Sequence, residues 1–443
     1  MSMLLFSGLA IAAGYIASKV FGDDSSKTQS PTTYTYTPSG PSVTQPAGAG
    51  RKTTSPKRSR SRAKTTSATT YASPASAAAP ATGGGGWMAQ CDMGGGSGGT
   101  AVFGDSDGPV TVYDAEGIPL QLGIEQEFAS GGEGTVYSCP NKPKFVIKIY
   151  KRRILENTAK RDALERRLRD MLAIEPLRNT PDVAWPLMPV FDENKRVAGF
   201  VMRAVKGTSM RALQGSAQIK RLFLGWNRKD LALVAKDFLD KMQLLAGNGV
   251  LVNDFNPANF LVGKDHRVML IDCDSYQIPS RDGGEPHVAT SYFASHVAPE
   301  LLRNPEGLNR PRGPEQARFG AAIIAFQLLM CGLHPYSHKN GGTPEGNLKA
   351  GKCPLGLKSG CMLPSGWYNL ISYLPFTMME TFIRMFRDGH GNPAARPTLA
   401  ELRKQVEKFL FVMEKDPVRR DLAPKSPKPK SDSSNWSEKN NAA

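Results

Sequence analysis

Two carboxylates, each placed beside a short apolar run, are the feature that most constrains this chain. Asp254 precedes the apolar residues 260–262, with Asn259 between them, and Asp272 follows the apolar pair 270–271. Phosphoryl transfer needs one carboxylate to orient the attacking hydroxyl, and an amide with a second carboxylate to hold magnesium on the phosphates. The spacing therefore predicts a phosphoryl-transfer site that uses ATP and Mg²⁺.

Composition bounds the partners without choosing one. The 443 residues carry 56 basic and 40 acidic side chains, for a formal charge of +16. A basic chain suits a nucleotide, an acidic substrate, a membrane surface or nucleic acid, so the sign of the charge does not decide. The six cysteines form no CxxC pair and are widely scattered. This pattern argues against zinc and against a disulfide framework, and indicates reduced thiols.

The first residues form an uncharged apolar segment. Residues 1–18 hold no charged side chain, and Val20 and Phe21 extend the apolar stretch beyond Lys19. That length approaches the ~20 residues that cross a bilayer. We predict a single-pass anchor in residues 1–21, in the inner or plasma membrane, with a cleaved signal peptide as the alternative. Because positive charge follows the segment, the rest of the chain is expected in the cytoplasm.

The flanks of the chain have the composition of disordered segments. Residues 22–118 are rich in Ser, Thr, Pro, Ala and Gly, and residues 414–443 in Pro, Lys and Ser. Such segments bury too little apolar surface to offset chain entropy. Residues 51–64 form a basic patch, which is either a solvated linker or a second contact with anionic lipid, at ~1 kcal/mol per charge. Nucleic acid ranks below lipid as a partner.

Residues 119–413 have a globular pattern. Short β-rich runs come first (135–137, 145–150 and 199–202), with a charged helical stretch, 152–173, among them. After residue 210 helical spacing dominates, and 323–330 is an apolar helix candidate. A small β-rich lobe followed by a larger helical lobe predicts an α+β, two-lobed architecture with a cleft between the lobes.

A glycine-rich turn and a strand lysine lie at the start of this region. Gly131, Gly132 and Gly134 precede a strand, and glycines let backbone N–H groups approach phosphate oxygens. Lys148 follows between two isoleucines, so it needs a partner if it points inward. The chain offers Glu165 as that partner, beside the leucine stripe of the charged helix, with Glu156 as the competitor. An edge lysine and a surface glutamate are the alternatives.

Six segments, in order, resemble the eukaryotic-like protein kinase superfamily, over residues 119–413 or so. The segments stand where this superfamily has its glycine-rich loop, VAIK strand, HRDxxxxN loop, DFG, APE and late arginine: 129–136, 145–148, 252–259, 272–274, 297–300 and 396–398. The sequence around Asp254 and Asp272 is similar to that of a divergent bacterial branch of this superfamily. The resemblance implies a two-lobed protein-kinase-like fold and an ATP-dependent protein serine/threonine kinase, with autophosphorylation as a further expectation.

The resemblance also assigns roles to residues. It implies that Asp254 orients the hydroxyl, and that Asn259 and Asp272 hold Mg²⁺. Lys148 and Glu165 would position the phosphates. The nucleotide-binding residues would be those of the glycine-rich loop and the hinge: Gly131, Gly132, Gly134, Val136, Lys148, Arg203 and Val205. Glu300 and Arg396 would form a buried structural pair in the helical lobe.

Departures from the family pattern leave alternatives open. Asn253 and Asn256 replace an arginine and a lysine, and Ala317 stands where an aspartate usually braces the catalytic loop. Asp274 replaces the DFG glycine, either as a further metal ligand or as a solvated side chain. A pseudokinase scaffold is therefore the first rival, an aminoglycoside-kinase-type phosphotransferase the second, and a membrane-tethered lipid or nucleic-acid binder the third. The protein substrate is left unknown.

Overall fold

The structure is a computed structural model that describes residues 110–139, 142–288, 290–339, 341–356, 360–364 and 366–428. The predicted anchor, residues 1–21, and the basic patch, residues 51–64, lie outside these ranges. Within them, no helix is both long and apolar enough to cross a bilayer.

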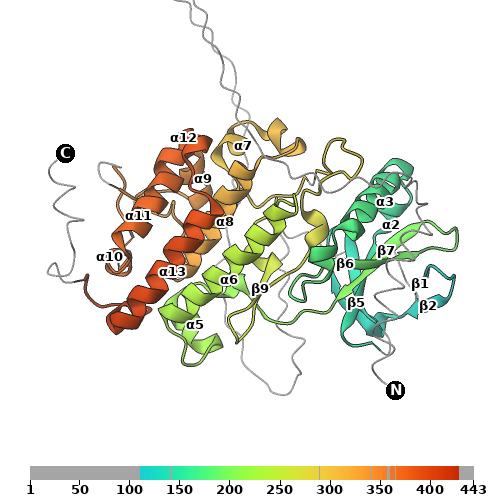
Figure 1. Cartoon of the computed structure of the whole chain (residues 1–443), viewed down its shortest axis with the longest axis horizontal. Helices are drawn as coiled ribbons and strands as arrows, with labels where there is room; N and C mark the ends of the chain where they lie inside the picture. The colour runs from blue at the N-terminus through green and yellow to red at the C-terminus, as the bar shows by residue number, and fades with distance from the viewer. Residues whose placement is uncertain are drawn as a thin grey trace, which may run out of the picture. The chain divides into compact units, whose positions relative to one another are not determined.

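A seven-stranded antiparallel sheet forms the first lobe (Figure 1). Its spatial order is β2-β1-β6-β7-β5-β4-β3, so β5 lies between β4 and β7. The predicted runs are found in β4, β5 and β7. The strands are β1 (Val110–Tyr113), β2 (Pro119–Leu122), β3 (Glu127–Ser130), β4 (Gly134–Ser138), β5 (Phe145–Tyr150), β6 (Pro186–Phe191) and β7 (Val197–Arg203).

The charged helical stretch is two helices and not one. Helix α2 (Arg152–Leu155) ends at Glu156, and α3 (Thr158–Ala173) begins after Asn157, whose side chain accepts a hydrogen bond from the Lys160 N–H. An asparagine at this position satisfies one of the free N–H groups of the first turn, which favours a new helix start. Leu168 and Leu172 of α3 then pack against the sheet.

The second lobe is helical around a large apolar core. Its longest helices, α6 (Arg228–Gly247), α8 (Pro314–Leu329) and α13 (Leu399–Lys415), pack on one another. The predicted apolar helix is the buried half of α8. The remaining α-helices are α4 (Glu175–Arg178), α5 (Ser216–Leu222), α7 (Pro299–Arg303), α9 (Pro344–Lys349), α10 (Trp367–Ser372), α11 (Phe376–Ile383) and α12 (Gly389–Gly391).

A small antiparallel sheet lies at the junction of the lobes. Its order is β10-β9-β8, with β8 (Thr208–Ser209), β9 (Phe260–Val262) and β10 (Val268–Leu270). A backbone bond from the Ala184 N–H to the Leu270 carbonyl (2.9 Å) ties β10 to the chain that enters the large sheet. The α+β, two-lobed, protein-kinase-like fold predicted from the sequence is confirmed.

The folded region is longer at both ends than the sequence predicted. The β1–β2 hairpin begins at Val110, inside the segment predicted as linker up to residue 118. At the other end, Leu422 is buried in the core of the helical lobe, although residues 414–443 were expected to be disordered. The first segment is short and the second is polar in composition, so their few buried apolar side chains did not stand out from the neighbouring linkers.

Candidate active site

The loop between α6 and β9 brings two predicted site residues together. The Asn256 N–H donates to Asp254 Oδ1 (3.1 Å), and the Asn259 side chain donates weakly to the Asp254 carbonyl (3.5 Å). The Ile271 N–H donates to the Asn259 carbonyl (3.0 Å), which places Asp272 beside this loop. The hairpin β9–β10 therefore positions Asp254, Asn259 and Asp272 as neighbours.

Asp254 is half-buried and has a raised pKa. Burial is the main cause and the negative charge of Asp272 adds to it, while the Asn256 N–H opposes it. A carboxylate with a raised pKa is a stronger proton acceptor than one in water, which suits a group that orients or deprotonates a hydroxyl. Asp272 has a φ of 56°, in the left-handed region, and such backbone strain is concentrated at functional sites.

Lys148 of β5 reaches this cluster from the other lobe. Its Nζ lies 2.8 Å from Asp272 Oδ1 and 2.8 Å from Asp274 Oδ1. Burial alone would lower the pKa of Lys148, but the two carboxylates outweigh burial and the pKa is raised. Lys148 is thus a buried, charged group held between two acidic side chains.

The predicted contact between Lys148 and Glu165 does not form. Glu165 Oε1 instead accepts from Arg196 Nε (2.8 Å) and from the Val197 N–H (3.2 Å), at the start of β7. Glu165 and Arg167 lie two positions apart, about 200° around a helix of 3.6 residues per turn, so they face opposite sides of α3. The face of α3 that meets the site carries Arg167, which donates to the Tyr276 carbonyl.

The glycine-rich turn closes the end of the β3–β4 hairpin. The Gly131 N–H donates to the Gly134 carbonyl (2.9 Å). A Cβ on Gly134 would lie 2.7 Å from the Ile149 carbonyl, so the close approach of β4 to β5 requires glycine there. At Gly132 an added Cβ meets nothing within 4 Å. The turn therefore has open space over it, and Val136 packs as a partly buried residue on the core beneath.

The predicted hinge is the chain between β7 and β8. Arg203 ends β7 and donates from its side chain to the Arg178 carbonyl, and the Ala204 N–H donates to the Lys144 carbonyl (2.9 Å). Val205 packs with Val136 against the core of the sheet lobe. Arg203 thus makes a structural contact, and the side chains of Ala204 and Val205 lie against the apolar core.

Arg312 is a site residue that the sequence did not indicate. It is 7% exposed, and its Nη1 donates to the Asn253 carbonyl (2.8 Å), next to Asp254. The Arg312 N–H donates to Gln277 Oε1 (2.7 Å), and Gln277 Nε2 donates to the Arg312 carbonyl (3.0 Å). Burial lowers the pKa of Arg312 to about 10. Arg312 braces the loop between α6 and β9. Ala317 has no polar side chain for this role, and the carboxylate of Glu315 pairs with Arg318 instead.

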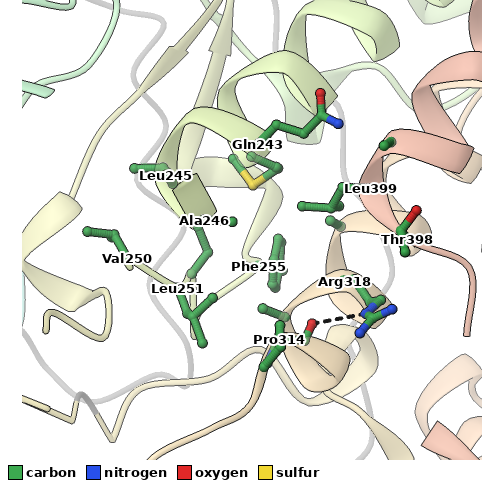
Figure 2. A pocket seen from close by; sticks show the side chains of 15 residues that line it. Gln243, Leu245, Ala246, Val250, Leu251, Phe255, Pro314, Arg318, Thr398 and Leu399 are labelled. Carbon is green, nitrogen blue, oxygen red and sulfur yellow. Dashed lines mark hydrogen bonds between the residues drawn. The ribbon is translucent and has the colours of Figure 1, made fainter. Parts of the chain in front are cut away.

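A largely apolar cavity of about 290 Å³ lies beside the loop that carries Asp254, between α6, α8 and α13 (Figure 2). Phe255 and Val252, the neighbours of Asp254 and Asn253, both line it, as does Ala317. The Phe255 ring packs directly on α8, where a Cβ added to Gly320 would lie 2.2 Å from it. The small residue at 317 thus leaves space beside the loop that an aspartate would partly fill.

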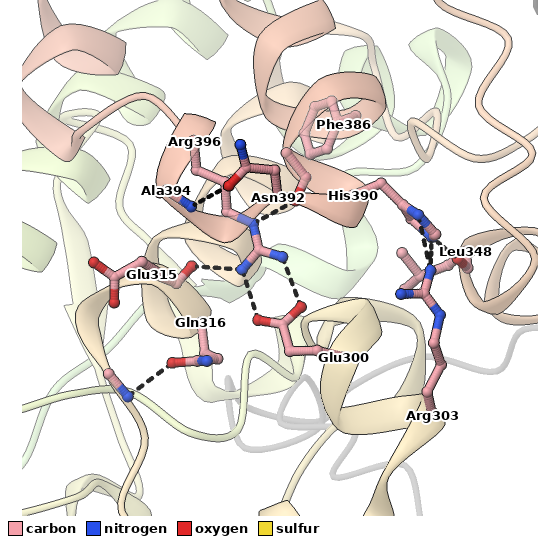
Figure 3. A network of polar contacts seen from close by, with 12 residues as sticks. Glu300, Arg303, Glu315, Gln316, Leu348, Phe386, His390, Asn392, Ala394 and Arg396 are labelled. Carbon is pink, nitrogen blue, oxygen red and sulfur yellow. Dashed lines mark hydrogen bonds and ion pairs between the residues drawn. The ribbon is translucent and has the colours of Figure 1, made fainter. Parts of the chain in front are cut away.

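Glu300 and Arg396 meet in the helical lobe (Figure 3). Arg396 donates to both carboxylate oxygens of Glu300, at 2.9 and 2.6 Å, and its side chain is fully buried. The other donors reach the carbonyls of Gly389 (2.8 Å) and Glu315 (3.1 Å), and the guanidinium lies over the Phe319 ring. The contacts with Glu300 and Glu315 join segments more than 80 positions apart, so the pair has a structural role.

The donor set fits the predicted magnesium ion. Lys148 takes Oδ1 of Asp272, and among the described residues no hydrogen bond engages Oδ2, on a side chain that is 43% exposed. Asn259 donates through its nitrogen, which leaves the amide oxygen. One carboxylate oxygen and one amide oxygen suit Mg²⁺, which keeps waters and phosphate oxygens as its other ligands.

Comparison with known proteins finds protein kinases among the relatives of this chain. No family model matches the chain. Two curated relatives, both described as protein kinase YegI, come from Escherichia coli O157:H7 and from Escherichia coli strain K12. Each is 29% identical, over 229 and 230 residues, which is 51% and 52% of this chain and 34% of each relative. The chain thus spans about a third of the length of these relatives.

Fold, site and similarity define a protein-kinase-like domain. The similarity, 29% identity over about half of the chain, supports a divergent bacterial member of the protein-kinase-like superfamily. Kinases as a class use ATP and Mg²⁺, and the oxygen donors of Asp272 and Asn259 suit the magnesium ion.

Proposed function

We propose that this protein is an ATP-dependent protein kinase that transfers the γ-phosphate to serine or threonine hydroxyls. The observation that carries the proposal is the link between the lobes: Lys148 of the sheet lobe lies 2.8 Å from Asp272, beside Asp254 and Asn259. A lysine for phosphates, two metal ligands and a carboxylate for the hydroxyl are the groups that this reaction needs.

Each residue would act through its own atoms. Asn259 and Asp272 would hold the metal, which supplies positive charge against the phosphates. Lys148 would bind the α- and β-phosphate oxygens under the glycine turn, Gly131 to Gly134. Asp254, with its raised pKa, would accept a hydrogen bond from the substrate hydroxyl and align it for attack. Adenine would lie against Val136 and Val205.

A protein substrate is supported by a second cavity, of about 620 Å³, beside the catalytic loop. Pro257 of that loop lines it together with Phe293 and Ser295, which precede the segment 297–300. A cavity of this size has room for side chains of an extended peptide. This is the feature that favours a protein kinase over a phosphotransferase of small molecules.

The pseudokinase alternative draws on Asn253 and Asn256. An asparagine at 256 lacks the charge that would stabilise the transferring phosphoryl group, and such electrostatic terms are often the largest in catalysis. The brace supplied by Arg312 weakens this rival, because it holds the catalytic loop without the missing aspartate. The membrane anchor at residues 1–21, with the basic patch as a second lipid contact, stays a proposal.

The test is phosphate transfer from γ-labelled ATP to casein by the full chain with Mg²⁺, followed by phosphoamino-acid analysis. Asp254→Asn is expected to lower the rate about 10²–10⁴-fold, as for loss of a general base. Asp272→Asn should abolish the metal dependence together with the rate.

Asp265→Asn is the matched control, since Asp265 is an exposed carboxylate in the β9–β10 turn. Transfer that is equal in all four proteins would reject the assigned site. ATP binding without any transfer would favour the pseudokinase, and label on tyrosine alone would reject serine and threonine as acceptors.

A further inference from the structure

The acidic residue Asp274 lies on the buried side of Lys148. Its side chain is 4% exposed, against 43% for Asp272, and its Oδ1 lies 2.8 Å from Lys148 Nζ. Its other oxygen, Oδ2, accepts from the Tyr150 hydroxyl at 2.6 Å. Both oxygens are therefore engaged by β5, and the contact is shielded from water.

Strand geometry explains why two residues of β5 reach one carboxylate. Side chains two positions apart along a strand point to the same face, so Lys148 and Tyr150 project together. The Tyr150 ring also lies beside Phe200 of β7, with the ring centroids 6.1 Å apart. The hydroxyl is thus fixed by packing, and it in turn fixes the orientation of Asp274.

Helix α3 contributes a positive charge to the site, although a negative one, that of Glu165, was expected. Glu165 is held by Arg196, away from the site. Arg167 instead donates to the carbonyl of Tyr276, two residues after Asp274, and its charge acts on Asp274 and Glu133. The helix therefore supplies a cation to the site, and the carboxylate for Lys148 comes from the segment after β10.

We propose that Asp274 is the positioning residue that holds Lys148 for the nucleotide phosphates, in place of a helix glutamate. It stands where the kinase pattern has a glycine, so the site gains at 274 the carboxylate that α3 does not deliver. With Lys148 held from the buried side, Asp272 keeps its exposed oxygen for the metal. This inference rests on the proposed nucleotide-binding function.

The direction in which Asp274→Asn changes ATP binding shows whether Asp274 positions Lys148 or only adds negative charge. A carboxylate that only added negative charge near the phosphates would, on removal, strengthen the binding of anionic ATP. A carboxylate that holds Lys148 would, on removal, let Lys148 swing toward Asp272, and ATP binding would weaken. A metal ligand would matter only when Mg²⁺ is present.

The test is binding of mant-ATP, a fluorescent ATP, to the full chain in EDTA and again with Mg²⁺. In EDTA, Asp274→Asn is expected to weaken binding about tenfold, the size of one charged hydrogen bond. The double variant with Lys148→Met should bind no more weakly than Lys148→Met alone, since the two residues act as a unit. Glu165→Gln, the matched carboxylate-to-amide control, should bind as the unchanged protein does.

Tyr150→Phe keeps both charges and removes only the 2.6 Å bond, so it tests the idea even if Asp274→Asn folds poorly; we expect binding about threefold weaker. Unchanged or tighter binding by Asp274→Asn in EDTA would overturn the inference, as would a Glu165→Gln protein that loses as much. Failure of the unchanged protein to bind mant-ATP under either condition would instead reject the nucleotide-binding function itself.

Discussion

The two ion pairs predicted from the sequence had opposite outcomes, although both join a carboxylate to a cation. Glu300 and Arg396, 96 positions apart, meet as a buried bidentate pair. Lys148 and Glu165 are much closer in sequence and do not meet; Lys148 binds Asp272 and Asp274 instead. Distance along the chain is therefore a poor guide to which pair forms.

The difference lies in how each backbone is fixed. Pro299 starts α7 beside Glu300, and Thr398 caps α13 just after Arg396, so short local signals set the position of both side chains. On α3, by contrast, the direction in which Glu165 faces depends on how the helix packs on the rest of the fold. Arg167 and Asp170 face the segment after Asp272, and Glu165, two positions from Arg167, faces the β6–β7 hairpin.

The largest expected effect on stability is at the pair that forms, Glu300 and Arg396. Arg396→Met removes a fully buried cation and leaves Glu300 without its partner, which costs about 3–5 kcal/mol of unfolding free energy for a buried pair. Urea unfolding followed by circular dichroism measures this. Arg384→Met is the control, because Arg384 and Glu401 form an exposed pair; a comparable loss there would show that the two pairs do not differ in kind.

The same pair predicts an acid dependence of stability. Burial would raise the pKa of Glu300, but the bonds from Arg396 outweigh it and lower the pKa. A lowered folded-state pKa means that the contribution is fully present above the ordinary value of about 4.3 and is lost as the pH falls through the folded value. Glu300→Gln should cost about 2 kcal/mol at pH 7, after some discount for solvent.

Urea midpoints of the unchanged protein and of Glu300→Gln, taken between pH 7 and pH 3, measure that gap. The difference between the two midpoints should become smaller only as the pH falls below about 4.3. A gap that stays constant across the whole range would mean that the ionisation of Glu300 does not matter to the fold.

Sequence patterns predicted the elements of this site better than its contacts. The strands around Lys148 and the apolar runs around Asp254 and Asp272 follow from local alternation and length, which depend on neighbouring residues only. No local pattern marks Arg312 as a site residue, because its role depends on a hydrogen bond to the Asn253 carbonyl, 59 positions away. Asp274 was visible in the sequence, but its burial against Tyr150 and Lys148 needed the relative position of the two lobes.

Arg167 offers a smaller test of how α3 docks. Arg167→Met removes the bond to the Tyr276 carbonyl and should cost about 1.5–2 kcal/mol, the lower end of the range for a hydrogen bond with a charged group. Amide hydrogen exchange should quicken in α3 more than in α6. Arg166→Met, at an exposed neighbouring position, is the control; equal exchange in both variants would show that this bond does not hold the helix.

The smallest expected effect on stability is at Glu165, and this variant tests most directly whether Glu165 belongs to the site around Lys148. Glu165 pairs with Arg196, whose side chain is 37% exposed, and such partly exposed pairs contribute about 0–1 kcal/mol. Glu165→Gln should therefore lower the unfolding free energy by less than about 1 kcal/mol and leave phosphate transfer unchanged. A stability loss with normal transfer keeps Glu165 as a structural residue of the β6–β7 contact. Lost transfer with unchanged stability would mean that α3 rotates when nucleotide binds and delivers Glu165 to Lys148 after all.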